Sequence, residues 1–356
     1  MKLIAFYLPQ FHEIPENNDA WGNGFTEWTN VKKARPLYLG HSQPRVPLHN
    51  RYYDLLEDGV MEWQMSLAKK AGIYGFCFYH YWFHGRMVLE KPVGMLLKNK
   101  NIDFHYCFSW ANEPWTKTWH GAGGNKEILI PQTYGGEEEW EAHYGYFRHF
   151  FQDERYIKEK NRPVVLIYRL RNIPHFNDMI RYWNRRAKED GFAGIFLVSM
   201  DIWREQAAKS HWVDGTVDFE PNKTRAEHMY ASTIVKPTES QSLLRNRLAI
   251  RSMDYSEINE RMVRMPHGKN HFRTVFVDFD DSPRRGTKAV IARGSTPERF
   301  GKYLKESIQL SQEEGNEYLF INAWNEWGEG NYLEPDTRHG YGYLRQIRVA
   351  MEELTE

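Results

Sequence analysis

Cysteine is almost absent from this 356-residue chain, which contains only Cys77 and Cys107. Each lies inside an apolar run that is typical of a buried strand, so we expect both to be reduced core residues. A disulfide framework is therefore not indicated. Two thiols in core positions fit a protein of a reducing compartment.

The chain also lacks net charge and long apolar runs. It has 47 Lys and Arg against 47 Asp and Glu, so no basic face for nucleic acid or an anionic membrane is indicated. No apolar run reaches the roughly 18 residues that a membrane helix needs. The first run, Leu3 to Leu8, stops at Pro9 and is too short for a signal-peptide core. These absences predict a cytoplasmic enzyme without a membrane span.

Several motifs of cofactor and metal chemistry are missing as well. No Gly-x-Gly-x-x-Gly follows the first expected strand, and the histidines show no His-Glu-x-x-His spacing. Asp278, Asp280 and Asp281 could bind a divalent cation, but a polar turn explains them equally well. Ser/His/Asp and Cys/His nucleophile motifs are absent. We therefore expect no cofactor and no metal.

Aromatic residues, in contrast, are abundant. The chain has 13 Trp, 21 Tyr and 20 Phe, which together make up 15% of its residues. This is more than a core alone requires, and carbohydrate-binding clefts use aromatic rings as stacking platforms. The composition therefore favours a sugar ligand.

Short apolar runs separated by helical patterns predict the fold. Eight such runs occur, at residues 3–8, 73–79, 104–109, 163–168, 194–199, 215–219, 274–278 and 318–322. Buried strands that alternate with helices in this way most simply close into a (β/α)8 TIM barrel, an α/β fold whose active site lies where the strands end. The alternative is an open doubly wound sheet. We expect a single barrel over residues 1–356, with the basic, polar stretch 222–271 inserted in the βα loop after the sixth strand.

The last expected strand leads into an unusual stretch, residues 324–334. It carries three carboxylates, three aromatic residues and two glycines in eleven positions. Glu326 and Glu329 are three residues apart, so one turn of backbone would point both carboxyls into one pocket, beside Trp324 and Trp327. Two carboxylates among aromatic rings are the equipment of glycoside chemistry. Glu326 and Glu329 are therefore the candidate catalytic residues; the alternative is a surface turn, which rarely carries two tryptophans.

Further candidates for sugar binding lie at other strand ends. Asn112-Glu113-Pro114 resembles the Asn-Glu pair of many retaining barrel glycosidases, which makes Glu113 a rival catalytic acid. That pair follows the fourth strand in those enzymes and the third strand here, which favours substrate binding for Asn112 and Glu113. The remaining candidates are two histidines, three tryptophans and one acid: His12, His80, Trp28, Trp82, Trp115 and Glu220.

Arg284 and Arg285 follow the seventh expected strand. A pair of guanidinium groups at that place can hold a carboxylate or a phosphate. We expect one of them to face the cleft and bind an anionic group of the glycan or its carrier. The alternative is a salt bridge to Asp280, Asp281 or the inserted segment.

The chain resembles a known family of barrels. Asn325-Glu-Trp-Gly-Glu-Gly330, followed by Leu333-Glu-Pro335, resembles the Asn-Glu-Trp-His-Glu-Gly signature of glycoside hydrolase family 99, the endo-α-mannosidases and mannanases. The likeness is closer to the WbsX-like proteins of bacterial polysaccharide biosynthesis clusters. Their pattern is visible at Phe6-Tyr-Leu-Pro-Gln-Phe-His12, Gly24-Phe-Thr-Glu-Trp-Thr-Asn-Val31, Phe108-Ser-Trp-Ala-Asn-Glu-Pro-Trp115 and Asp280-Asp-Ser-Pro-Arg-Arg-Gly286.

This resemblance implies a (β/α)8 barrel and a retaining reaction without a covalent enzyme intermediate. Glu326 would deprotonate the sugar 2-hydroxyl, which displaces the leaving group to give a 1,2-anhydro sugar. Glu329 would act first as acid and then as base. By the same likeness Asn325 would orient the sugar, and Tyr7 and Trp110 would line the cleft.

The chain departs from the hydrolase signature at two positions. Gly328 stands where the hydrolases have His, and Asn331 stands where they commonly have Thr. Both carboxylates remain, but the preference for mannose is left open.

Three functions compete at this point. The first is a retaining glycoside hydrolase or transglycosylase that acts on an α-linked bacterial polysaccharide or oligosaccharide, of mannose type if the resemblance extends to the substrate. The second is a glycosyltransferase of lipopolysaccharide, O-antigen or capsule biosynthesis, and the third is a glycan-binding protein without turnover. Asp278-Phe-Asp280 fits the Asp-x-Asp motif of transferases, but no second domain for a nucleotide follows it. The hydrolase is therefore placed first, with a carbohydrate as partner in every case.

Overall fold

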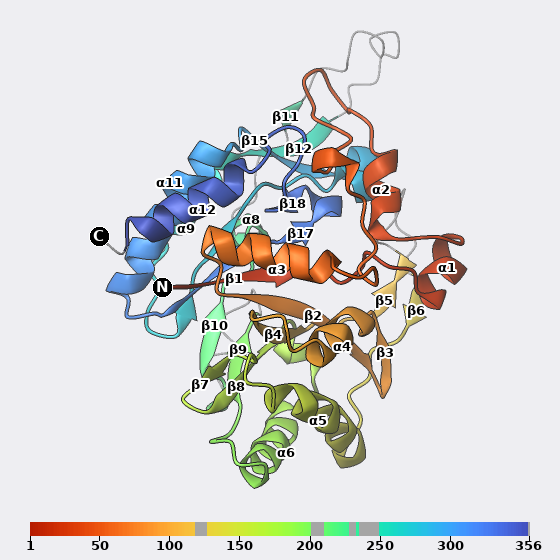
Figure 1. Cartoon of the computed structure of the whole chain (residues 1–356), viewed down its shortest axis with the longest axis vertical. Coiled ribbons are helices and arrows are strands. Elements are labelled where there is room, and N and C mark those ends of the chain that lie inside the picture. The colour runs from red at the N-terminus through yellow and green to blue at the C-terminus, as the bar shows by residue number, and fades with distance from the viewer. Residues whose placement is uncertain (118–126, 201–209, 228–232, 235–248, 355–356) are drawn as a thin grey trace.

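A nearly closed barrel of parallel strands forms the centre of the molecule (Figure 1). The computed structural model describes residues 1–117, 127–200, 210–227, 233–234 and 249–354. The barrel strands follow the order β13-β10-β9-β8-β4-β2-β1-β16-β14. Their bounds are β1 Lys2–Tyr7, β2 Gly75–Phe83, β4 His105–Trp110, β8 Arg162–Ile167, β9 Phe196–Ser199, β10 Gly215–Val217, β13 His271–Phe272, β14 Thr274–Phe276 and β16 Tyr318–Asn322.

The seventh strand is expected at 274–278, where β14 lies, and β13 lies just before that range. Only Arg273 separates β13 from β14, and each of the two pairs with a different neighbour. Thr216 of β10 pairs with His271, whereas Thr274 pairs with Phe320 of β16. The interrupted strand therefore closes the ring between β10 and β16, and the predicted barrel is confirmed.

Helices follow most of the barrel strands and form an outer layer, as a parallel sheet with two buried faces requires. Those that surround the barrel are α3 Val60–Ala71, α4 Lys91–Lys98, α5 Glu137–Phe151, α6 Phe176–Glu189, α11 Pro297–Glu313 and α12 Gly342–Glu352. Figure 1 shows α5 and α6 together on one side and α11 beside α12 on another. The α11 helix begins as expected, because the side chain of Thr296 accepts a hydrogen bond from the backbone N–H of Arg299 and Pro297 occupies the first turn.

Shorter elements cover the end of the barrel where the strands finish. Loops after β1 carry α1 Pro15–Trp21, α2 Glu27–Lys33 and η1 Leu48–Asn50, and later loops carry η3 Leu170–Asn172, α10 Ser282–Arg285, η5 Gly286–Lys288 and η6 Trp327–Glu329. The small strands at this end are β3 Arg86–Val88, β5 Trp115–Thr116, β6 Ile128–Ile130, β17 Asn325–Glu326 and β18 Asn331–Tyr332. Another short strand, β7 Lys158–Glu159, pairs with the beginning of β8.

The stretch expected as an insertion lies between β10 and β13. Its described part contains α8 Asn222–Glu227, β11 Thr233–Ile234, β12 Ala249–Asp254 and α9 Tyr255–Arg264, while 228–232 and 235–248 lie outside the described residues. Strand β12 pairs in parallel with β15 Val290–Arg293, so the stretch joins the segment that follows β14.

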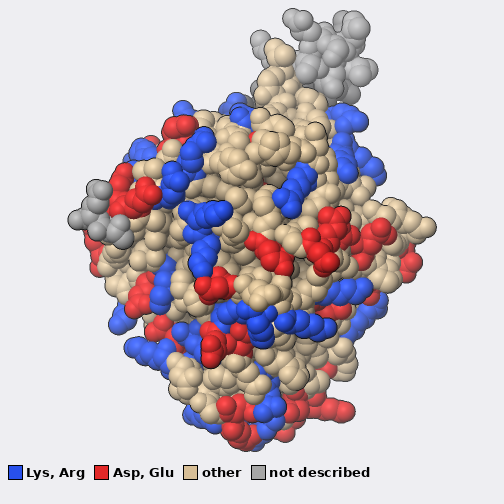
Figure 2. Space-filling view, in the orientation of Figure 1, with Lys and Arg blue, Asp and Glu red and all other residues tan. Residues whose placement is uncertain are grey.

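Charged side chains are mixed on the face drawn in Figure 2, where basic and acidic groups alternate without one large field of either sign. Within the described residues, every helix is too short or too polar to cross a membrane.

Candidate active site

A cavity of about 890 Å³ opens at the carboxyl ends of the barrel strands. This is the end at which barrel enzymes carry their active sites. Its wall is built from β2 and from segments after β4, β8, β10, β14 and β16. The lining comprises Tyr79, Tyr81, Ala111, Glu113, Pro114, Trp115, Thr116, Tyr168, Arg169, Phe219, Asn222, Arg225, Ala226, Arg251, Phe279, Asp281, Arg284, Arg285, Lys288, Glu326 and Glu329.

The guanidinium group of Arg284 joins three carboxylates at this cavity. Its Nη2 lies 3.0 Å from Glu326 Oε2, and its Nη1 lies 2.7 Å from Glu329 Oε1. Its Nε lies 2.9 Å from Glu27 Oε1 on α2. The side chain of Glu329 is 23% exposed, against 8% for Glu326, so Glu329 is the more open of the two candidate catalytic groups. Glu326 and Glu329 therefore share one pocket, held by one arginine.

The two carboxylates also differ in their electrostatic surroundings. Burial raises the pKa of Glu326 to about 8, the charge of Arg284 opposes this rise, and the charges of Glu329 and Glu27 add to it. Crowding of like charges thus contributes to the rise, but burial is its largest cause. The protonated form of Glu326 is favoured near neutral pH.

Gly328 leaves the space that this arrangement needs. A Cβ atom at Gly328 would lie 1.8 Å from Glu27 Oε1 and 2.7 Å from Arg284 Nε. No side chain fits there while Glu27 and Arg284 keep their contact. Gly330, at the end of the same turn, has a φ of 61°, a conformation that glycine adopts without strain.

Tyrosines that the sequence analysis did not select complete the wall. Tyr79 and Tyr81 of β2 and Tyr168 after β8 line the cavity. The hydroxyl of Tyr79 is buried without a hydrogen-bond partner among the described residues. Burial raises the pKa of Tyr79 well above its usual range, and the charges of Glu326 and Glu329 raise it further, so its hydroxyl lies close to both acids. The period of two along β2 places Tyr79 and Tyr81 on one face of the strand, but the sequence does not show that this face is the interior one.

Six of the residues expected at the site line the cavity. Besides Glu326 and Glu329 they are Glu113, Trp115, Arg284 and Arg285. Glu113 pairs with Arg169 at 3.0 Å and is about half exposed, and Trp115 packs edge-on against Tyr81.

The two arginines have different partners. Arg284 contacts the three glutamates and lines the cavity. Arg285 makes the alternative contact, with 3.0 Å between its Nε and Asp281 Oδ2, while its side chain stays 56% exposed.

Four expected residues on barrel strands lie away from the cavity because they point outward. Tyr7 donates a hydrogen bond to Gln64 of α3 at 2.7 Å. His80, Trp82 and Trp110 each pack against His143 of α5. Neighbouring residues of a strand face opposite sides of the sheet, so these four contact the helical layer and not the barrel interior.

Trp324, Trp327 and Trp28 belong to the support of the site. Glu334 accepts hydrogen bonds from the indole nitrogens of Trp324 at 3.1 Å and Trp327 at 2.6 Å. Trp327 stacks on Tyr332, with 3.7 Å between ring centroids, and also contacts Trp28. The faces of these rings are therefore covered by protein and do not line the cavity.

Both candidate asparagines join loops to each other. Asn325 bonds to the backbone N–H and C=O of Leu8 at 2.8 and 2.9 Å, which fastens the loop after β16 to the end of β1. Asn112 makes the same pair of bonds, each 2.8 Å long, with the backbone of Arg169.

The last two candidates, His12 and Glu220, are buried outside the cavity lining. Burial lowers the pKa of His12 to about 4. Glu220 accepts bonds from the backbone N–H of Thr224 at 2.9 Å and from its hydroxyl at 2.6 Å.

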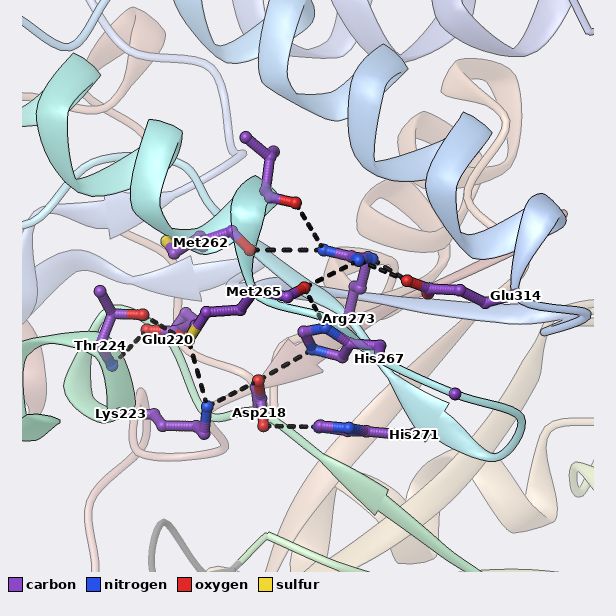
Figure 3. Close-up of polar contacts among 12 residues, drawn as sticks. Asp218, Glu220, Lys223, Thr224, Met262, Met265, His267, His271, Arg273 and Glu314 are labelled. Atoms are coloured by element: carbon purple, nitrogen blue, oxygen red, sulfur yellow. Dashed lines mark hydrogen bonds and ion pairs between the residues drawn. The ribbon is translucent and has the colours of Figure 1, made fainter.

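A group of possible metal ligands lies outside the cavity, between β10 and the stretch before β13 (Figure 3). Asp218 accepts contacts from ring nitrogens of His267 and His271 at 2.9 and 2.8 Å. The ammonium group of Lys223 also lies 3.0 Å from Asp218 Oδ2. Because this cation already faces the carboxylate, the cluster is better suited to internal ion pairing than to a dication.

Asp278 and Asp280, which fit an Asp-x-Asp pattern, contact the loop before η1. Arg45 Nη2 lies 2.8 Å from Asp278 Oδ2, and His41 Nε2 lies 2.8 Å from Asp280 Oδ2. Neither aspartate lines the cavity.

The fold and the paired acids define a TIM barrel with a carboxylate site at the carboxyl ends of its strands. The family model described as "Glycosyltransferase WbsX" matches residues 3–347. The chain therefore belongs to the WbsX family.

Relatives agree with this assignment. The uncharacterized protein WxcX of Xanthomonas campestris pv. campestris (strain ATCC 33913) is 33% identical over 353 residues, which are 98% of this chain and 49% of the relative. Its counterpart in strain B100 is 34% identical, with the same coverage. The chain thus spans about half the length of the curated relatives that it matches.

Solved structures support the fold. The GH99 endo-alpha-mannosidase of Bacteroides thetaiotaomicron superposes with a TM-score of 0.58 at 14% identity and covers 99% of this chain and 97% of its own. A "Glycoside hydrolase-like protein" gives 0.57 at 13% identity, with 98% and 93% covered. At such identity the likeness shows the barrel alone.

Proposed function

We propose that the chain is a carbohydrate-active enzyme, a retaining glycoside hydrolase or transglycosylase that acts on an α-linked bacterial polysaccharide or oligosaccharide. The observation that carries this proposal is the pair Glu326 and Glu329 on one cavity wall, bridged by Arg284. Two neighbouring carboxyl groups in different surroundings can divide acid and base roles. The tyrosines and Trp115 beside them offer surfaces for a sugar ring.

The different exposure of the two acids supports a division of labour. Glu329, the more open, is suited to protonate the leaving-group oxygen and then to activate the incoming water or acceptor hydroxyl. Glu326, the more buried, accepts the proton of the sugar 2-hydroxyl, whose oxygen attacks C1 as the glycosidic bond breaks. The raised pKa makes Glu326 a stronger base once it is ionised.

Replacement of each acid tests these roles. Glu326→Gln and Glu329→Gln keep the shape of the side chains but remove the proton transfers, so each is expected to lower turnover by at least about 100-fold. The assay is incubation with a panel of α-linked bacterial glycans, with products followed by mass spectrometry and the anomeric configuration by NMR. Glu113→Gln serves as the comparison. Near wild-type cleavage by either variant, or an inverted product, would contradict the proposal.

The pH profile gives a second test, because the direction in which kcat/KM changes with pH depends on the role of Glu326. A base must be ionised, so kcat/KM is expected to rise as pH passes upward through about 8, the pKa of Glu326. A profile that falls through the same range would instead make Glu326 the acid.

Glycosyl transfer is the second candidate function, and the family description favours it. A transferase that uses a nucleotide sugar with a divalent cation would need free aspartates, and Asp278 and Asp280 are engaged by Arg45 and His41. Transfer from a glycan donor is therefore the better form of this candidate. Consumption of nucleotide sugars only when an acceptor is present would reverse the order.

A further inference from the structure

One arc of the cavity wall is strongly basic. Arg225 of α8, Arg251 of β12, Arg285 of α10 and Lys288 of η5 all line it. Asp281 is the carboxylate on this arc, and it pairs with Arg285. Four cations against one carboxylate leave a surplus of three positive charges on this arc, whereas the described lining as a whole has six cations and four carboxylates.

Arg225 is the most enclosed of these cations. Its Nη1 is buried without a hydrogen-bond partner, and its guanidinium carbon lies 5.5 Å from the ring centre of Phe279. Burial lowers the pKa of Arg225; the charges of Asp281 and Glu329 oppose this shift, and those of Arg285 and Arg251 add to it. A buried donor without a hydrogen-bond partner is costly, and a bound anion would relieve that cost.

Arg251 and Lys288 also have N–H donors that are not paired with a carboxylate among the described residues. Arg251 uses one nitrogen to bond the carbonyl oxygen of Lys288 at 2.7 Å. Within the described part of the chain, neither Arg251 nor Lys288 pairs with a carboxylate. Both side chains are exposed and lie on the cavity wall.

The strand order separates this basic arc from the part of the wall that carries aromatic side chains. Tyr79 lies in β2, and Trp115 and Tyr168 follow β4 and β8. These three strands are consecutive in the barrel, whereas the basic residues are carried by segments after β10 and β14. Arg225 also lies close enough to Glu329 for the two charges to interact. An anion on the basic arc would therefore lie beside the candidate acid and across the barrel from the stacking surfaces.

We propose that Arg225, Arg251, Arg285 and Lys288 form a subsite for a phosphate or diphosphate group carried by the substrate. This inference rests on the proposed function and names its substrate class: a sugar whose leaving group or acceptor bears an esterified phosphate. A phosphate monoester carries about two negative charges at neutral pH, whereas a sugar carboxylate carries one, so phosphate matches the surplus better. Arginine forks suit its oxygens geometrically.

The test is binding of inorganic pyrophosphate, measured by calorimetry and by the shift of the unfolding midpoint. The wild-type chain should bind it, and Arg225→Met and Lys288→Met should each weaken binding about tenfold or more, because each removes a charge-assisted contact. Methionine keeps the apolar stem in both variants. Arg348→Met on the outer helix α12, where Arg348 is 60% exposed, is the matched control and should bind like the wild type.

Further ligands test which kind of molecule carries the phosphate and whether a carboxylate can replace it. Uridine diphosphate and farnesyl diphosphate present the group on a nucleoside and on a lipid, and tighter binding of one than of pyrophosphate assigns the carrier. Glucuronate is the carboxylate comparison. No binding of pyrophosphate, equal binding by wild type and both cavity variants, or glucuronate binding as tight as that of pyrophosphate would overturn the proposal.

These measurements need no turnover. Pyrophosphate binding can therefore fail while glycan cleavage persists, or hold when no glycan is cleaved. The subsite and the proposed reaction thus stand or fall separately.

Discussion

Gly328, Glu27 and Arg284 form one unit although they come from three distant segments. The hydrolase signature has His where this chain has Gly328, and the absent side chain leaves the space in which the carboxylate of Glu27 meets Arg284. Arg284 then reaches both Glu326 and Glu329. The absence of a side chain at position 328 is thus tied to the way in which Arg284 holds the two acids.

The addition of a single methyl group at position 328 tests this unit. Gly328→Ala is expected to lower the free energy of unfolding by about 1–3 kcal/mol, because the new atom overlaps Glu27 and Arg284 in a closed space. Activity should fall with it, since Arg284 must shift from the two acids. Chemical unfolding and glycan cleavage are the measurements.

Gly145→Ala is the matched control for that substitution. Gly145 lies in α5 with no atom within 4 Å of an added Cβ, so alanine there should raise stability by about 0.5–1 kcal/mol. Equal effects at both glycines would contradict the role assigned to Gly328.

The sequence identified Glu326 and Glu329 because both lie in one short stretch. It did not identify Glu27 as part of the site, although Glu27 belongs to the family pattern at residues 24–31, because its contact with Arg284 spans 257 positions. A contact of this kind depends on how loops from the first and seventh strands meet, which no local pattern encodes.

At the scale of the elements, the strands were predictable and the inward-facing residues were not. Apolar runs located every barrel strand except the two-residue β13, because a strand buried on both faces is apolar throughout. For the same reason the alternation of polar and apolar residues was lost, and nothing in β2 distinguished Tyr79 and Tyr81 from His80 and Trp82. Strand ends were selected by residue type, which brought in outward-facing aromatics.

Paired tyrosine variants test the two faces of the sheet. Tyr79→Phe removes a hydroxyl that has no partner in the described structure, so stability should change by less than about 0.5 kcal/mol. Turnover should fall about tenfold if that hydroxyl bonds the sugar in the transition state. Tyr7→Phe leaves Gln64 without its donor inside the helical layer and should cost about 1–2 kcal/mol of stability. Loss of stability by the Tyr79 variant without loss of turnover would reverse the assignment of faces.

Glu334 holds the loop after β16 in place, because its carboxylate accepts hydrogen bonds from four side chains. These are the side chains of Tyr53, Gln64, Trp324 and Trp327. Both tryptophans that the sequence suggested as sugar platforms are thereby fixed as supports. The abundance of aromatic residues in 324–334 located the site but did not show whether each ring lines the cavity or supports it.

At the scale of the whole molecule, buried carboxyl groups make stability depend on pH. Burial raises the pKa of Glu326 to about 8, those of Glu334 and Glu220 to about 7, and that of Asp281 to about 6. Contacts with His267, His271 and Lys223 hold the pKa of Asp218 well below its usual range, and those with His41 and Arg45 lower that of Asp280. The carboxyls with raised pKa values affect the stability of the fold at neutral and alkaline pH, and those with lowered pKa values affect it in acid.

The sign for each set follows from proton linkage. A carboxyl with a raised pKa stabilises the fold while it holds its proton, and this contribution is lost as pH rises through its folded-state pKa. A carboxyl with a lowered pKa stabilises the fold while ionised, and its contribution is lost in acid. Stability is therefore expected to be greatest in the mildly acidic range and to decline as pH rises through about 6 to 8.

Thermal unfolding at a series of pH values between about 5 and 9 measures this decline. Glu220→Gln provides the control, because an amide can keep a bond to Thr224 but does not titrate. The variant should lose stability less steeply than the wild type as pH passes through about 7, the pKa of Glu220. A midpoint that rises steadily toward alkaline pH, or a variant with the same slope as the wild type, would show that these carboxyls are ionised in the folded chain at neutral pH. In that case Glu326 would already be in its basic form at neutral pH, and the rise of kcat/KM through about pH 8 would not be expected.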